Sequence, residues 1–188
     1  KYIIDPQWKP IIKDISINKY SANGKLDTIA IYYNNKIKIY NYRTGTTDEY
    51  NDNSDVNDVS YSTTQMFWIN ISNIDISNVE KLKMTINGDQ ISILTTNDEI
   101  IIYNYDIDYE DWNQIYNVTY SNISDFTQND NGNILSLINN NNQVSIYDLS
   151  NNNLNLLGQE LSGSFVSMNF SGNTISLVNN DEIIVYDL

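Results

Sequence analysis

The sequence predicts an all-β fold, and three observations carry that prediction. Apolar residues recur at every second position in short runs such as 144–146 and 183–185, which is the period of a strand with a buried face. Ile, Val and Tyr dominate these runs, and such side chains pack well on a pleated sheet but lose rotamer freedom in a helix. Asn-Asn and Asn-Asp pairs separate the runs and tolerate the positive φ of hairpin turns. No segment of the sequence shows an apolar 3.6-residue period over three turns.

The same pattern occurs four times along the chain. Each copy has a turn Gly, an Ile/Leu-rich strand, an Asn/Asp turn and a β-branched strand that closes on Tyr-Asn or Tyr-Asp; the copies begin at Gly24, Gly88, Gly132 and Gly172. The closing Tyr residues stand at positions 40, 103, 147 and 186, so the steps are 63, 44 and 39 residues. Self-similarity at about 40–45 residues with several strands per unit is typical of the blades of a β-propeller. The longer first step indicates an insertion. We therefore expect about four blades of antiparallel strands, as a small closed ring or as part of a larger propeller.

The units resemble WD40-type propeller blades. In that family the third strand of a blade ends in Trp-Asp, and here the pairs that stand in those places are Tyr40-Asn41, Tyr103-Asn104, Tyr147-Asp148 and Tyr186-Asp187. The resemblance covers nearly the whole chain. The family's Gly-His pair is absent because the chain has no His, so the hydrogen-bond network of regular blades cannot be carried over. For the four closing Tyr side chains we expect packing in the core.

We interpret residues 1–188 as a single propeller-like domain. The blades are expected at about 14–76, 79–121, 123–161 and 165–188. Within residues 1–13, Pro6 and Pro10 restrict the chain to an edge strand or an extended arm, and we expect this arm to complete the last blade. Residues 42–64 form the insertion, which is rich in Asp and Asn and is expected to be a solvated loop.

Composition excludes several classes of function. The net charge is −14, with 24 acidic and 10 basic residues, which argues against the phosphate backbone of nucleic acids and against anionic membrane surfaces. No apolar run reaches the ~20 residues of a membrane span. The chain has neither His nor Cys, so nucleophile–His pairs, thiol chemistry and the usual transition-metal ligands are absent. We expect no enzyme, no cofactor and no metal. We favour the cytoplasm over a cell or virion surface, and the sequence does not fix the compartment.

The residues that we expect to bind a partner are acidic and aromatic. Residues 105–112 mix carboxylates with Tyr and Trp, and the insertion adds a second acidic stretch. The candidate partner-binding residues are Asp106, Asp108, Glu110, Trp112, Asp52 and Asp55. Both stretches follow the third strand of a blade, so the resemblance implies that they lie on one face. We interpret the chain as a non-enzymatic protein–protein interaction or scaffolding module, whose partner offers a basic or amphipathic segment.

Three alternatives remain open. The first is an exposed structural or adhesive protein of a virion or cell surface that binds carbohydrate through Trp and Asn. The second is an enzyme with paired carboxylates. A third reading concerns Asn129–Asn133, which faintly resembles a calcium loop and supplies oxygen ligands at short spacing.

Overall fold

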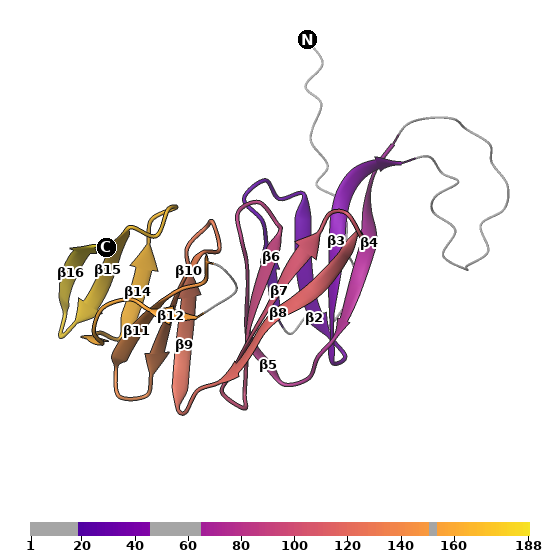
Figure 1. Cartoon of the computed structure of the whole chain (residues 1–188). Coiled ribbons are helices and arrows are strands. Elements are labelled where there is room, and N and C mark those ends of the chain that lie inside the picture. Colours follow the sequence, from indigo (N-terminus) through magenta and orange to yellow (C-terminus); the bar gives the residue numbers. More distant parts are fainter. Residues whose placement is uncertain (1–18, 46–64, 151–153) are drawn as a thin grey trace, which may run out of the picture.

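The computed structural model describes residues 19–45, 65–150 and 154–188. These ranges hold four antiparallel sheets, which stand side by side in chain order (Figure 1). The first and the fourth sheet lie at opposite ends of this stack (Figure 1), so the four blades form an open array and not a closed ring. Within these ranges no helix is long and apolar enough to cross a membrane. The predicted all-β, propeller-like fold with about four blades is confirmed.

The first three blades have a complete set of strands and the fourth has three. The strands of the first blade are β1 (Lys19–Ala22), β2 (Thr28–Tyr33), β3 (Lys36–Gly45) and β4 (Gln65–Asp75). Those of the second are β5 (Val79–Met84), β6 (Gln90–Thr95), β7 (Glu99–Asp106) and β8 (Asp111–Thr119). Those of the third are β9 (Ile123–Gln128), β10 (Ile134–Asn139), β11 (Gln143–Asp148) and two short outer pieces, β12 (Asn155–Leu156) and β13 (Leu161–Ser162). Those of the fourth are β14 (Phe165–Met168), β15 (Thr174–Asn179) and β16 (Glu182–Asp187). The expected arm, residues 1–13, lies outside the described residues.

The sheets in the middle of the stack are apolar on both faces, because a neighbouring blade covers each face. Side chains alternate between the two faces of a strand. In the second blade, Ile91 and Ile93 pack toward the first blade, and Leu94 and Ile100 pack toward the third. We call the face that meets the next blade along the chain the forward face, and the opposite one the rear face.

The strand register places equivalent residues on the same face in every blade. The forward-face positions of the two central strands are Ala30, Tyr32, Ile37 and Ile39, then Ser92, Leu94, Ile100 and Ile102, then Ser136, Ile138, Val144 and Ile146, then Ser176, Val178, Ile183 and Val185. The main rear-face positions are Ile29, Ile31 and Tyr40, then Ile91, Ile93 and Tyr103, then Leu135, Leu137 and Tyr147, then Ile175, Leu177 and Tyr186. The closing Tyr of each repeat therefore lies on the rear face. The last three of these Tyr rings pack against the apolar clusters between blades.

The first hairpin of each blade closes through the same hydrogen-bonded turn. A side-chain oxygen of its first residue accepts a bond from the backbone N–H five residues later. The four bonds run from Thr28 to Asn23 Oδ1 (3.1 Å), from Gln90 to Thr85 Oγ1 (3.1 Å), from Ile134 to Asn129 Oδ1 (2.8 Å) and from Thr174 to Asn169 Oδ1 (3.2 Å). The segment with a faint resemblance to a calcium loop is thus the turn of the third blade, and the Oδ1 atom of its first residue already accepts a backbone bond.

Hydrogen bonds also join these turns from one blade to the next. Gly24 N donates to Ile86 O (2.9 Å), and Ile86 N donates to Asp130 O (3.1 Å). Between the last two blades, Asn129 Nδ2 donates to Phe170 O (3.0 Å). Successive turns therefore meet at one end of the stack.

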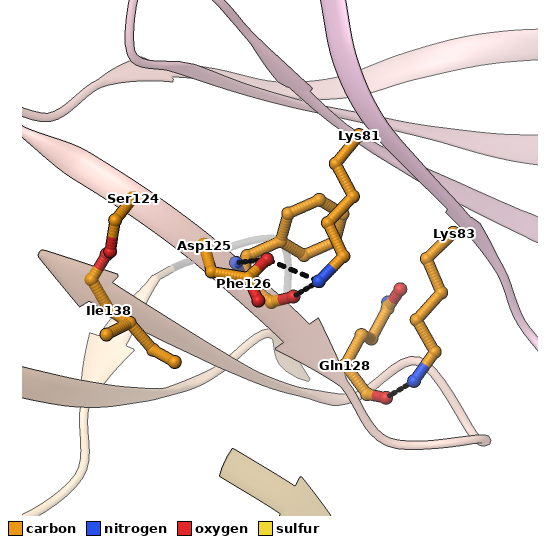
Figure 2. Close-up of polar contacts among 7 residues, drawn as sticks. All are labelled: Lys81, Lys83, Ser124, Asp125, Phe126, Gln128 and Ile138. Carbon is orange, nitrogen blue, oxygen red and sulfur yellow. Dashed lines mark hydrogen bonds and ion pairs between the residues drawn. The ribbon is translucent and has the colours of Figure 1, made fainter. Parts of the chain in front are cut away.

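Two lysines on β5 reach across to the third blade (Figure 2). Lys81 pairs with Asp125, donates to Phe126 O (2.7 Å) and lies 5.3 Å from the centre of the Phe126 ring. Lys83 donates to Gln128 O. Burial lowers the pKa of Lys83 below its ordinary value, and the negative charge of Asp130 opposes that shift. The ammonium groups thus cap backbone carbonyls that point between two blades.

The fourth residue of the repeated turn adopts a left-handed backbone conformation. Gly occupies it in three blades, with φ of 76° at Gly88, 78° at Gly132 and 76° at Gly172. The first blade has Leu26 there, with φ of 57°. Gly24 is therefore not the turn Gly of the first repeat, and the alignment predicted from the sequence is wrong by two residues.

Replacing Leu26 with Gly is expected to stabilise the protein. A left-handed conformation costs a non-Gly residue about 1–2 kcal/mol, and the added flexibility of Gly in the unfolded chain offsets about 0.5–1 kcal/mol of that gain. Because the Leu26 side chain is exposed, the substitution loses little burial. We expect the free energy of unfolding, measured by urea denaturation, to rise by about 0.5–1 kcal/mol.

The matched control is Gly132→Ala, which makes the opposite change at the equivalent position. A Cβ atom there would lie 2.6 Å from Gln90 Oε1 and 2.8 Å from Thr85 Cγ2, so the free energy of unfolding should fall by at least about 1 kcal/mol. A Leu26→Gly protein that is less stable than the wild type would contradict the strain argument.

Candidate interaction surface

The turn between β7 and β8 forms a compact acidic tip on the second blade. Asp106 ends β7, and its Oδ1 accepts bonds from the backbone N–H groups of Asp108 (3.0 Å) and Tyr109 (3.4 Å). Glu110 completes the turn with φ of 52°. A carboxylate that bonds backbone groups two and three residues later restricts a turn to one shape. We call residues 106–111 the β7–β8 tip.

The tip exposes two large side chains that are not among the binding residues predicted from the sequence. Ile107 is 79% exposed and Tyr109 is 80% exposed. They alternate with Asp106, Asp108 and Glu110, so each apolar group has carboxylates on both sides in the sequence. The sequence offered one indication of this exposure. Ile107 and Tyr109 stand in an acidic stretch that is too short to form another strand.

Trp112 directly follows the tip in the sequence, and its side chain is buried. Its side chain is only 6% exposed and belongs to the apolar cluster between the first two blades. The ring lies 5.6 Å from that of Tyr105, its cross-strand partner, at an interplanar angle of 49°. Its Nε1 group is buried without a hydrogen-bond partner in the described ranges. The Trp112 backbone N–H, in turn, donates to Asp111 Oδ1 (2.8 Å).

The remaining candidate residues fall into two groups, one in the tip and one outside the described residues. Asp108 and Glu110 are exposed, and Asp106 is half-buried. Asp52 and Asp55 lie outside the described residues, so their place on the same face as the tip stays a prediction. In the part of the chain that the structure describes, no group of three or more acidic side chains is arranged to hold a metal ion.

A polar pocket lies at the opposite end of β7. It has a volume of about 410 Å³ between the first two blades, and Asn35, Asp75 and Glu99 contribute to its lining. Both carboxylates already have partners, because Asp75 pairs with Lys36 (3.0 Å) and Glu99 accepts a bond from Thr95 Oγ1 (3.2 Å). Since Glu99 begins β7 and Asp106 ends it, the pocket and the β7–β8 tip lie at different ends of the blade.

Solved structures confirm the fold. The β-propeller domain of Myceliophteria thermophila Cps50 (Swd1) matches with a TM-score of 0.58 at 8% identity, over 92% of this chain and 54% of that one. Hsv2 of Kluyveromyces lactis matches with a TM-score of 0.57 at 13% identity, over 92% of this chain and 45% of that one. WD40 propellers are among the similar structures, so the resemblance drawn from the Tyr-Asn and Tyr-Asp pairs is confirmed at the level of fold.

A third similar structure is a candidate 6-phosphogluconolactonase from Bacteroides uniformis. It matches with a TM-score of 0.57 at 16% identity, over 91% of this chain and 50% of that one. The fold therefore does not decide between binding and catalysis, and the absence of enzymatic activity stays a prediction. This chain spans about half the length of the three propellers. No protein-family model and no curated protein matches the sequence.

Two substitutions test whether Trp112 stabilises the blade and whether Tyr109 does not. Trp112→Ala should lower the free energy of unfolding by about 3–5 kcal/mol, because it empties a buried aromatic site. Tyr109→Ala should change it by no more than about 0.5 kcal/mol, because the ring is exposed. Urea denaturation followed by circular dichroism measures both values. Equal losses for the two variants would show that the assigned roles are wrong.

Proposed function

We propose that this chain is a non-enzymatic protein-interaction module whose β7–β8 tip binds a basic or amphipathic segment of a partner protein. The observation that carries the proposal is the exposure of Ile107 and Tyr109 among the carboxylates of Asp106, Asp108, Glu110 and Asp111. Side chains exposed to this degree contribute little to the stability of the blade.

The chemistry of the tip favours a protein ligand. Tyr side chains anchor protein interfaces because they bury much area at a small entropy cost, and Ile107 adds exposed apolar area beside Tyr109. The carboxylates around Ile107 and Tyr109 favour Lys or Arg beside an apolar residue of the partner. The net charge of −14 adds a long-range attraction for a basic segment, which raises the association rate at low salt.

The geometry of the tip reduces the cost of binding. The bonds that Asp106 Oδ1 accepts and the buried Trp112 ring hold the turn in place before a partner arrives. A preorganised surface loses less conformational entropy on binding than a loop that must order itself. The acidic stretch with Asp52 and Asp55 is proposed as a second contact of the same kind.

The proposal is tested with a peptide library in which Lys or Arg alternates with apolar residues. Peptides selected on the immobilised protein are labelled, and their Kd is measured by fluorescence anisotropy at low and high salt. We expect Ile107→Ser with Tyr109→Ser to weaken binding at least about tenfold, as the loss of an interface anchor does. Asp108→Asn with Glu110→Gln should weaken binding at low salt and reduce its salt dependence.

The matched control is Glu80→Gln with Glu182→Gln, which removes the same charge from exposed positions outside the tip. At high salt its Kd should stay within about twofold of the wild type, since exposed charges distant from an interface are then largely screened. Selected peptides that bind all variants equally, or a library that yields no binder, would refute the proposed function.

A further inference from the structure

The exposed large apolar side chains that lie in turns gather at one end of the stack of blades. They are Leu26, Ile107, Tyr109 and Phe170, which are 68%, 79%, 80% and 50% exposed. Neighbouring strands of each sheet are antiparallel, so the turn between the first two strands of a blade and the turn between its third and fourth lie at the same end (Figure 1). At the opposite end, the turns within the described ranges have no exposed large apolar side chain. We call the first end the tip end, which consists of residues 23–27, 85–89, 106–111, 129–133 and 169–173.

Hydrogen bonds connect the β7–β8 tip with Phe170 through the turns that lie between them. Tyr105 N donates to Asp89 O (2.8 Å), which joins the base of the tip to the first turn of the second blade. A backbone bond joins that turn to the first turn of the third blade. Asn129 Nδ2 in the third blade then donates to Phe170 O in the fourth (3.0 Å). The path from the tip to Phe170 therefore crosses turns whose positions are fixed relative to one another.

The Phe170 side chain is not needed to form its own turn. The shape of that turn comes from Asn169, whose Oδ1 atom accepts the bond from Thr174 N (3.2 Å). The equivalent residues of the other blades are Gly24, Ile86 and Asp130. Because the repeated turn forms with residues of such different size and polarity at this position, an exposed Phe there is available for contact with another molecule.

The surface between the two apolar positions is acidic. From the second blade to the fourth, the tip end contains six carboxylates and no Lys or Arg. Asp89 is exposed, and Asp130 is half-buried and interacts with Lys83. A segment in which Lys or Arg alternates with apolar residues would therefore meet opposite charges along the path as well as apolar contacts at both of its ends.

We propose that the partner segment continues from the β7–β8 tip across the tip end of the stack and places a second apolar residue on Phe170. This inference rests on the proposed function and extends the contact from the second blade to the fourth. Stacked sheets lie about 10 Å apart, so two steps between blades span about 20 Å, which an extended chain covers with about six residues. The partner should therefore carry two apolar positions about six residues apart, with Lys or Arg between them. The second anchor adds affinity because the first has already brought it close to its site.

Synthetic fluorescent peptides with one or two apolar anchors test this inference. The reference peptide has a single block of Lys alternating with Leu. The others add a second Leu after a Lys/Ser spacer of about three, six or nine residues, a range set by the span of an extended chain. Fluorescence anisotropy should give the lowest Kd for the middle spacer. Phe170→Ser should raise that Kd at least about fivefold, as the loss of an interface anchor does, and should leave the Kd of the reference peptide unchanged.

The matched control is Phe165→Ser, which removes the same side chain from the same blade at a similar exposure of 56%. Phe165 begins β14, whereas Phe170 lies in the turn that follows this strand. The control should leave every Kd unchanged, and circular dichroism verifies that both variants are folded. Two-anchor peptides that bind no more tightly than the reference, or that are insensitive to Phe170→Ser, would overturn this inference and leave the proposed function standing. A reference peptide that does not bind would overturn both. Self-association of the protein that Phe170→Ser abolishes would assign the surface to a second copy and overturn the inference as well.

Discussion

A β-sheet that is apolar on both faces is stable only when both faces are covered, and the architecture of this protein depends on that constraint. Ile93 and Ile100 lie on opposite faces of the second blade, and each is fully buried by a different neighbour. Full burial of one such side chain contributes about 1.5–3 kcal/mol. A single blade could bury only part of this surface, because a small sheet needs another layer to be stable. The blades therefore stack, and one sequence pattern serves each of them.

Polar groups at the junctions of blades fix how neighbouring blades sit on each other. Ser92 Oγ on the second blade donates to Gln128 Oε1 on the third blade (2.8 Å). These groups are buried, so a shift of the third blade against the second would leave donors and acceptors without partners at a cost of about 1–3 kcal/mol each. Lys81 and Lys83 act in the same way on the backbone of β9. Apolar contacts between blades stabilise the stack, and these bonds fix the position of one blade relative to the next.

Much of this fold could be predicted from the sequence, because strands and turns leave local signals. Alternation of Ile and Val predicts the central strands, and the spacing of the closing Tyr residues predicts the blades. The position of Leu26 in the repeated turn could also have been predicted. In the second blade the turn Gly stands two residues before the next strand, whereas Gly24 stands four residues before β2. That difference indicates that Gly24 is not the equivalent residue.

The β7–β8 tip shows why the candidate site was harder to predict than the fold. Burial of Trp112 depends on its pairing with Tyr105 across the hairpin and on a neighbouring blade, and composition contains neither fact. A register shift between Ile102 and Tyr103 also interrupts the alternation of faces before the tip, so counting along β7 and β8 misplaces their ends. The reach of Lys81 and Lys83 toward β9 likewise joins residues more than forty positions apart. Local patterns specify strands, whereas contacts between blades decide which side chains stay in contact with solvent.

The three-stranded fourth blade also affects where the chain opens locally. In a stack whose contacts run between consecutive units, the resistance of each unit to opening depends on its own strands and on its immediate interfaces. The fourth blade has three strands and one covered face, whereas the second and third blades are held from both sides. Backbone amides of β14–β16 should therefore exchange with solvent through openings that leave the middle of the molecule intact. Such partial opening is local to the fourth blade, so it should appear in amide exchange before the chain as a whole unfolds.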